Sequence, residues 1–560
     1  MKYSARCSVR LAVASALITA SLAAFATEPS TKIAVVGPRT DQHTGMPSDA
    51  ELQTRGARIG RIEVQVDDIF ETQPARSLAS PYRLANALHI STQEETIRQQ
   101  LLFGSGEPFQ RRLLDETERL LRGQHYLNDA TVTSTRYHED NTVDVLVRVH
   151  DVWTLSPGFS FGRKGGENRT RLEFEDSNFL GLGKQVSLER SSDVDRTAWR
   201  LAYVDPNLFG TRWTLSTAYS SMSDGSEKLL ALSRPFYSLD SRWSANVEAA
   251  DLTSSISRYS LGKRVERFNM QERELDIGGG LSEGLSNGWV TRYLAGFRYD
   301  ERAFATRTDE PNALLPAGRT LSYPWVGVEI LEDNYRTTRN LDQIGRTEDL
   351  YLGRSVRLEA GFASPALGST RDAFILNGAL TAGAALGNER FLINTIGTRG
   401  RIEGGALVDA VLEAGSRFYL RQSQRRVFFA SANATVTSNL DPEKQLLLGG
   451  DNGLRGYPLR YQAGSANALI SLEQRFYTSW QPLKLFNVGA AVFFDAGRSW
   501  GRDEYAAPPA GWLKDVGIGL RLGSARSGLG SVLHIDLAMP LDRTRDIDSM
   551  QLLIESRKSF

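Results

Sequence analysis

The 560-residue chain has one cysteine, Cys7, and no apolar run of 18 residues after its first 26 residues. A lone thiol excludes a disulfide framework and a cysteine-based metal site. The missing apolar run excludes a transmembrane helix. Acidic and basic residues are equal in number, 66 each, whereas a nucleic-acid-binding protein usually carries a basic excess. The six histidines show no metal-ligand spacing, so we expect no metal and no cofactor.

The first 26 residues are typical of a secretory signal peptide. Lys2, Arg6 and Arg10 precede an apolar stretch over residues 11–24, and Ala24-Phe25-Ala26 offers a small-residue cleavage site. Cleavage removes the only thiol and leaves 63 basic and 66 acidic residues. Residues 27–59 are polar and aperiodic, which predicts a flexible leader.

A small α+β domain is predicted over residues 60–153. Alternating apolar residues indicate strands near residues 62–66, 130–137 and 142–151. Two helical patterns lie between the first two strands. Ser91 and Thr92 are candidate caps for the first helix, and residues 109–122 form the second, which Gly123 ends. The order strand, helix, helix, strand, strand resembles a POTRA (polypeptide-transport-associated) domain.

Residues 154–560 lose helical periodicity and show short alternating segments separated by turn signals. In residues 516–522 and 533–539, for example, apolar residues alternate with glycine or charged residues. An apolar face and a polar face suit a large transmembrane antiparallel β-barrel, with lipid outside and a polar lumen inside. A soluble β-sandwich alternates as well, but about 400 unbroken residues behind an export signal favour the barrel. The mainly β chain would then lie in the bacterial outer membrane.

The connections alternate between tight turns and long polar loops. Tight turns are predicted at residues 205–210 and 236–240, and longer loops near 302–320, 437–465 and 498–514. Bacterial barrels have short periplasmic turns and long outer loops. If the small domain lies in the periplasm, the 437–465 loop therefore starts from the outer side.

Nothing in the sequence predicts an enzyme. Residues 284–288 match the G-x-S-x-G nucleophile elbow around Ser286, but that motif requires a strand, a turn and a helix, and here strands lie on both sides. We therefore predict a hairpin turn. The segment 181–184 lacks the full spacing of a phosphate-binding loop.

The glycine-rich stretch 449–458 carries one arginine, Arg455, near the tip of its predicted fold. Alternation turns Asp495 inward on a later strand, and Gly517 and Gly519 turn inward on the next, which predicts an empty patch on the wall. A buried carboxylate is costly unless paired, and a guanidinium can pair with it through two bonds. Alternatively, Asp495 faces a wet lumen and Arg455 reaches solvent, as in charged porin lumens.

Three motifs in this region resemble those of the outer-membrane insertase and translocator superfamily of BamA/TamA type, which includes two-partner secretion transporters. They are the (V/L)-R-G-(F/Y) motif at Leu454, Arg455, Gly456 and Tyr457, the F-x-D-x-G motif at Phe493, Asp495 and Gly497, and the G-x-G-x-R-like strand at Gly517, Gly519 and Arg521. The turns at 178–183 and 205–210 resemble early barrel turns of the family, and the terminal Phe560 resembles a barrel-assembly signal. The resemblance implies a loop folded into the lumen and locked by the pairing of Arg455 with Asp495.

The chain departs from the family in two respects. A single POTRA-like unit is visible, where the main insertase has several. The family implies sixteen strands, whereas the alternating segments from residue 154 onward number about twenty, with the surplus near 269–300 and 372–420.

The first functional hypothesis is protein assembly in, or translocation through, the outer membrane. Its partners would be the lipid bilayer, unfolded or partly folded client proteins and periplasmic chaperones, but no nucleic acid. The domain would capture a client by adding a strand at a sheet edge. The alternative is a passive pore for small solutes. The sequence leaves the client, and the choice between insertion and secretion, open.

Overall fold

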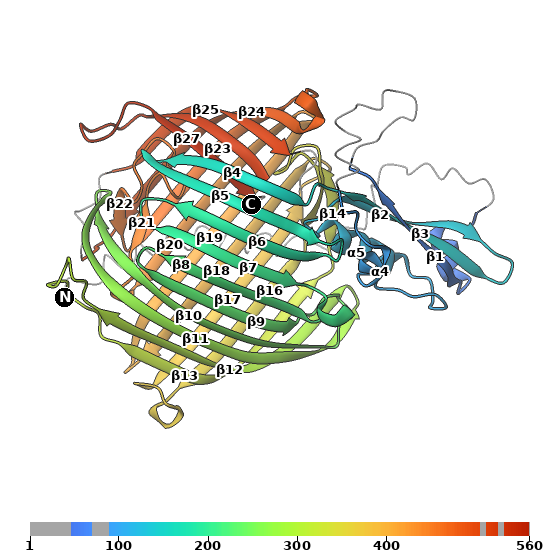
Figure 1. Ribbon diagram of the computed structural model, residues 1–560, viewed down its shortest axis with the longest axis horizontal. Coiled ribbons are helices and arrows are strands. Elements are labelled where there is room, and N and C mark those ends of the chain that lie inside the picture. Colours follow the sequence, from blue (N-terminus) through green and yellow to red (C-terminus); the bar gives the residue numbers. More distant parts are fainter. Residues whose placement is uncertain (1–45, 70–88, 505–510, 525–530, 559–560) are drawn as a thin grey trace.

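The computed structural model describes residues 46–69, 89–504, 511–524 and 531–558, which form a small N-terminal domain followed by a barrel (Figure 1). The elements of the domain are α2 (Asp49–Thr54), β1 (Arg58–Asp67), α4 (Glu94–Arg98), α5 (Arg111–Arg122), β2 (Leu127–Tyr137) and β3 (Thr142–Asp151). The predicted order of strand, helix, helix, strand, strand is confirmed from β1 onward. The sheet has the order β1-β3-β2, with β3 parallel to β1 and antiparallel to β2.

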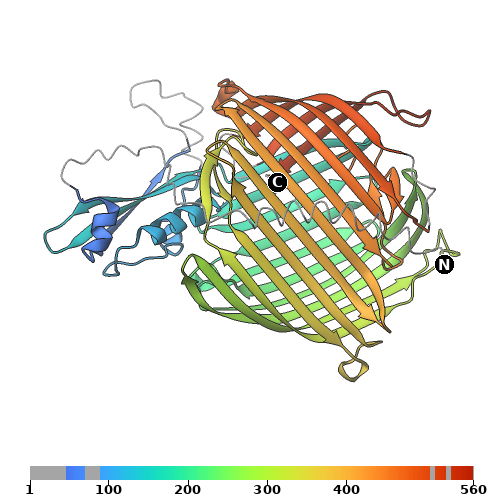
Figure 2. The ribbon, with the colours of Figure 1, turned by 180° about the vertical axis from the view of Figure 1, so that it is seen from behind.

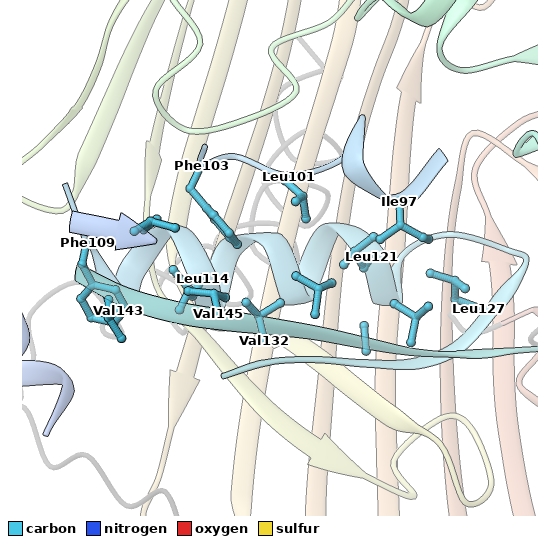
Figure 3. Packing of buried hydrophobic residues seen from close by; sticks show 14 of the residues in the cluster. Ile97, Leu101, Phe103, Phe109, Leu114, Leu121, Leu127, Val132, Val143 and Val145 are labelled. Carbon is cyan, nitrogen blue, oxygen red and sulfur yellow. The ribbon is translucent and has the colours of Figure 1, made fainter. Parts of the chain in front are cut away.

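One apolar core holds this domain together (Figure 3). The four valines of β3 at positions 143, 145, 147 and 149 are all buried, as their alternation predicts. Helix α5 packs Leu114 and Leu121 into the same core. The sequence predicts Leu113, Thr117, Leu120 and Leu121 on the buried side of α5. Thr117 and Leu121 are fully buried, as predicted, whereas Leu113 and Leu120 lie at the edge of the buried face and are only partly buried.

The first predicted helix, expected to run from its caps at Ser91 and Thr92 to Gly104, is much shorter in the structure. Helix α4 has five residues, and its N-cap is Gln93 without a side-chain hydrogen bond. The Thr92 hydroxyl, a predicted cap, donates instead to Asp151 Oδ1 over 2.7 Å. The Thr92 hydroxyl forms a stronger hydrogen bond with the buried Asp151 carboxylate than it would form with the N-terminus of the helix. Thr92 therefore links the helix to the end of β3.

The predicted leader ends earlier than residue 59. Helix α2 starts with a capping box between Ser48 and Glu51, and Leu52 is fully buried in the domain core. Residues 49–59 therefore belong to the domain, because Leu52 and Ile59 bury apolar surface that a free leader would expose to water. The predicted signal peptide lies outside the described residues.

Twenty antiparallel strands close the barrel in the part of the chain that the structure describes, so the count of alternating segments is right and the family-derived number of sixteen is wrong. The surplus segments are long wall strands and not loop extensions. The wall consists of β4 (Leu155–Lys164), β5 (Glu167–Phe179), β6 (Lys184–Ser192), β7 (Thr197–Asp205), β8 (Thr214–Met222), β9 (Gly225–Arg234), β10 (Trp243–Ser260), β11 (Lys263–Ser286), β12 (Trp289–Ala305), β13 (Arg319–Glu332), β16 (Arg354–Ala363), β17 (Ala373–Ala385), β18 (Arg390–Glu403), β19 (Ala406–Ser423), β20 (Arg426–Ser438), β23 (Ala466–Tyr477), β24 (Phe486–Trp500), β25 (Leu513–Ser524), β26 (Ser531–Pro540) and β27 (Gln551–Lys558).

The wall separates an apolar outer face from a polar interior. On β24, Val492 is 53% exposed on the outside while its neighbour Phe493 is buried inside. On β5, Leu172 and Phe174 are exposed, and Glu173 and Glu175 face the other way. This alternation over a closed sheet is what a lipid-facing barrel requires. Among the described residues, no helix is long and apolar enough to cross a membrane.

The N-terminal domain lies at one end of the barrel, which we call the proximal end (Figure 2). The connection after β5, and every second connection from there along the wall, lies at this proximal end. The loop between β20 and β23 starts from the opposite end, which we call the distal end. Residues 284–288 form the predicted hairpin turn between β11 and β12, with Asn287 and Gly288 at positive φ. One proximal connection is unexpectedly long. Residues 333–353 between β13 and β16 contain the hairpin β14 (Tyr335–Arg339) and β15 (Thr347–Tyr351).

Candidate functional site

The loop between β20 and β23 folds into the barrel. It contains the short pair β21 (Leu446–Leu448) and β22 (Gln462–Gly464). Leu454, Arg455 and Tyr457 are at most 2% exposed. The fold is tight enough to need glycine, since a Cβ on Gly450 would meet the Tyr457 carbonyl oxygen at 2.3 Å. We call residues 439–465 the lumen loop.

The structure places Arg455 directly against Asp495 of β24. Arg455 Nε lies 2.6 Å from Asp495 Oδ2, and Nη2 lies 2.8 Å from Oδ1. Both side chains are buried. The two parallel bonds match the fork of the guanidinium to the carboxylate. Ser471 adds a third contact, because its hydroxyl donates to Asp495 Oδ1 over 2.6 Å.

Arg455 also belongs to a larger buried charge cluster that the sequence analysis missed. Its Nη1 lies 2.7 Å from Glu473 Oε1 and 3.4 Å from Asp536 Oδ2. Glu473 Oε2 in turn accepts from Arg475 Nε over 2.9 Å. Arg521 forms an ion pair with Asp536. Glu473 and Arg475 alternate inward on β23, a signal that was visible in the sequence but carried no motif.

The predicted empty patch on the wall is wrong. A Cβ on Gly517 would meet Phe493 Cζ at 2.2 Å, and a Cβ on Gly519 would meet Asp536 Oδ1 at 1.8 Å. The space above the two glycines is therefore filled by side chains from the neighbouring strands β24 and β26. The Phe493 ring lies in turn beneath Arg455, whose Cζ is 3.4 Å from the ring centroid. The glycines allow Phe493 to lie flat and support the guanidinium.

The remaining predicted loop residues pack around this pair. Tyr457 donates its hydroxyl to the Lys514 carbonyl oxygen over 2.9 Å. A Cβ on Gly456 would meet Asp515 Cβ at 2.7 Å, and one on Gly497 would meet Leu454 at 3.2 Å. Both glycines therefore allow the loop to lie against the wall. The predicted assembly residue Phe560 lies outside the described residues.

A second group of buried contacts, which was not predicted from the sequence, binds the first part of the lumen loop to the wall. Asp441 Oδ2 lies 2.9 Å from Arg401 Nη1 and 3.0 Å from Arg319 Nη2. Glu443 accepts from Arg319 over 2.5 Å, and Arg258 Nη2 donates to the Pro442 carbonyl oxygen over 2.7 Å. All three arginines are at most 7% exposed and come from strands β10, β13 and β18. The loop is thus bound to both sides of the barrel wall.

The barrel closes through a short seam between its first and last strands. Among the described residues, β27 and β4 share one register pair, Ile554 with Arg163, whereas β10 pairs with β11 along its whole length. Lys164 strengthens the seam from β4. Its Nζ lies 2.8 Å from Glu555 Oε1 and donates to the Asp451 carbonyl oxygen of the lumen loop over 3.0 Å. The loop therefore contacts the seam as well as the opposite wall.

The N-terminal domain docks on the turns at the proximal end. Gln93 donates its backbone N–H to the Gly181 carbonyl oxygen over 2.9 Å, and Thr96 donates its hydroxyl to the same oxygen over 3.0 Å. On the turn after β9, Leu239 N donates to Glu116 Oε1 of α5 over 2.7 Å. The turn at 178–183, noted for its family resemblance, therefore contacts helix α4.

Acidic residues gather at one further place on the wall. Glu272, Glu274 and Asp300 are the one group among the described residues whose geometry would suit a metal ion. Arg302 already lies 2.5 Å from Glu272 and 3.1 Å from Asp300, so a cation of the protein balances this group. The expectation that no metal or cofactor binds stays a prediction.

A closed 20-stranded barrel with an apolar outer face and an occupied lumen defines a β-barrel protein of the bacterial outer membrane. Residues 352–554, which hold the lumen loop, Asp495 and the G-x-G-x-R-like strand, match the model of the Omp85 superfamily domain. The chain thus carries an Omp85 superfamily domain in its C-terminal part.

The chain is also similar to several solved structures. They include BamA from Haemophilus ducreyi lacking POTRA domains 1–3, at 12% identity and a TM-score of 0.39, with 90% of this chain and 85% of that chain covered. CdiB from Acinetobacter baumannii has 12% identity and a TM-score of 0.45, with 90% and 74% covered. CdiB from Escherichia coli has 14% identity and a TM-score of 0.45, with 90% and 76% covered. A comparison with curated protein sequences finds no match.

Proposed function

We propose that the protein inserts client polypeptides into the outer membrane or moves them across it, with its N-terminal domain in the periplasm as a POTRA-like receiver. The short seam between β4 and β27 carries the proposal. Because β4 and β27 share one register pair among the described residues, the seam leaves backbone groups of these two strands where a client strand can add. The other strands of the wall are paired continuously with their neighbours, so the seam is the place where two neighbouring strands separate most easily.

The lumen loop would keep the barrel wall folded while the strands at the seam separate and pair again. Arg455 ties the loop to β23, β24 and β26, and Lys164 ties it to the seam. Movement of the seam would thus be transmitted to a loop that is rigidly held elsewhere. We infer that the pairing of Arg455 with Asp495 keeps the lumen loop attached to β24 when the seam moves.

Strand β2, predicted from the sequence as residues 130–137, is an edge strand where a client could add, but part of its edge is already occupied. Val132 N donates to Glu118 Oε1 over 2.7 Å, and the Ala130 carbonyl oxygen accepts from Arg122 over 3.1 Å. These outward groups of the edge are thus already bound by α5. We propose that a client strand adds at the far part of β2, near Arg136, or along β1 near Gln65.

Photo-crosslinking tests this proposal. A photoreactive amino acid at Arg136 or Gln65, both exposed, is expected to capture unfolded outer-membrane or secreted polypeptides that mass spectrometry identifies. The matched control is Gln53, which is exposed on helix α2. Equal capture from all three positions would contradict strand addition at a sheet edge.

A passive pore for small solutes is the second candidate function. It predicts a high, steady conductance of the intact protein in planar bilayers that does not change when residues 27–153 are removed. The occupied lumen does not favour it, since the lumen loop crosses from β20 to the seam and is buried along much of its length.

A further inference from the structure

The connection 333–353 at the proximal end, which we call the strap, crosses the mouth of the barrel. It leaves the wall between β13 and β16. Its tip reaches β24, where Asn487 Nδ2 donates to the Ile344 carbonyl oxygen over 2.8 Å. A Cβ on Gly523 of β25 would lie 3.1 Å from Ile344. Since seven steps in the strand order separate β16 from β25 in a barrel of 20, the strap spans about a third of the circumference.

An apolar cluster fills the space between the strap and the wall. Leu341, Ile344 and Leu352 of the strap are at most 5% exposed. They pack against inward-facing side chains from five different wall strands, namely Phe391, Ile393, Tyr419, Val427, Phe429, Tyr477 and Val532. A porin lumen is polar and wet at this position. Apolar packing here therefore indicates that the strap excludes water from this part of the mouth.

The outer side of the strap is bound by the N-terminal domain (Figure 1). Arg122 of α5 forms two bonds of 2.8 Å with the Asp349 carboxylate of β15. Arg346 Nη2 donates to the Leu127 carbonyl oxygen of β2 over 2.8 Å. The guanidinium of Arg119 lies over the Tyr335 ring, 4.3 Å from its centroid. The domain thus holds both strands of the strap.

The inner side of the strap shares the charge cluster of the lumen loop. Arg475 Nη1 donates to the Leu341 carbonyl oxygen over 2.6 Å, while its Nε binds Glu473. Glu473 in turn binds Arg455. Two neighbouring buried charges on β23 therefore bind the two segments. Arg475 contacts the strap on the proximal side, and Glu473 contacts the lumen loop on the distal side.

We propose that the strap is a removable plug of the proximal mouth, and that docking of the N-terminal domain holds it shut. A hairpin of two strands is at best marginally stable alone in water, so the position of the strap depends on its contacts on both sides. The strap contacts the wall through the apolar cluster and Arg475, and it contacts the domain through polar groups that lie between two units of the chain. Displacement of the domain removes Arg122 and Arg119 from the strap and frees the mouth.

Cysteine labelling in lipid vesicles tests the plug. In a chain with Cys7→Ser, the single substitution Val532→Cys places a thiol under the strap, where Val532 is 5% exposed. A membrane-impermeant maleimide applied from the proximal side is expected to label it slowly. When an Asn-Gly turn replaces residues 333–353 between the neighbouring strand ends at Glu332 and Arg354, labelling should accelerate by about tenfold or more, because no local opening is then required.

A charge reversal tests the role of the domain. Asp349→Arg should also accelerate labelling of Cys at position 532, and the exchanged pair Arg122→Asp with Asp349→Arg should slow it again. Ser286→Cys, in an exposed turn at the same end, is the control whose labelling rate stays constant. Heat-modifiable migration on gels reports that each variant retains its barrel.

Two results would overturn the proposal. One is unchanged labelling of Val532→Cys after the strap is removed from a folded barrel. The other is acceleration by Asp349→Arg that the exchanged pair does not reduce, which would show that the domain does not hold the strap through this ion pair. Neither readout requires a client, so both remain informative if the proposed transport function fails.

Discussion

At the residue scale, the lumen loop depends on Arg455, an arginine at the centre of a buried cluster. Three carboxylates, Asp495, Glu473 and Asp536, lie within 3.4 Å of its guanidinium. Taking so many charges out of water is costly, and only their mutual contacts offset the cost. The cluster therefore makes the site specific for an arginine at this position.

Removing one member of the pair should destabilise the barrel strongly. Arg455→Ala or Asp495→Asn is expected to lower the free energy of unfolding by about 3–5 kcal/mol, because a buried charge is left without its partner. Urea titration in lipid vesicles, followed by tryptophan fluorescence and gel mobility, measures the change.

Arg399→Ala is the matched control for this prediction. Arg399 and Glu413 are both more than half exposed and lie 3.9 Å apart, so the substitution should change the free energy of unfolding by no more than about 0.5 kcal/mol. Equal effects of the two arginine substitutions would contradict the role assigned to Arg455.

The sequence predicted only the part of this cluster that carries motifs. Arg455 and Asp495 stand out because glycines and aromatics surround them at fixed spacing. Glu473 and Arg475 lie in an ordinary alternating strand, where nothing distinguishes a buried charge pair from one that faces water. Asp441 and Arg401 are missed for the same reason, since their contact joins residues 40 positions apart.

At the element scale, the lumen loop fits because glycine occupies its points of closest approach. Gly450→Ala is expected to weaken loop packing and to expose Lys444 and Arg460 to trypsin added at the distal end, because the new Cβ would overlap the Tyr457 carbonyl oxygen. Limited proteolysis of the folded barrel measures the cleavage rate.

Gly397→Ala in β18 is the control substitution. A Cβ at Gly397 meets no atom within 4 Å, and its φ is not positive, so cleavage should remain as slow as in the unchanged chain. Faster cleavage in both variants would show a general loosening of the barrel and would refute the specific role of Gly450.

At the scale of the whole molecule, sequence and structure agree on the main features. The start of the barrel, the number of alternating segments and the element order from β1 to β3 could be read from periodicity. The strap could not, because its polar hairpin resembles any loop until the apolar residues that it covers are placed around the mouth. Family resemblance predicted sixteen strands, since motifs near Arg455 and Asp495 do not report the size of the wall.

The most direct test of the central claim, a client pathway through the seam of β4 and β27, is a disulfide across that seam. Cross-strand partners are close enough for such a bond, so Arg163→Cys with Ile554→Cys should close the seam under oxidation. The control pair, Ala218→Cys with Leu229→Cys, joins β8 and β9 elsewhere in the wall. Insertion of a urea-unfolded outer-membrane barrel protein into vesicles, or its passage into them, is then measured. If clients pass through the seam, oxidation stops this activity only in the seam variant and a reductant restores it, whereas full activity of the oxidised seam variant would contradict a pathway through the seam.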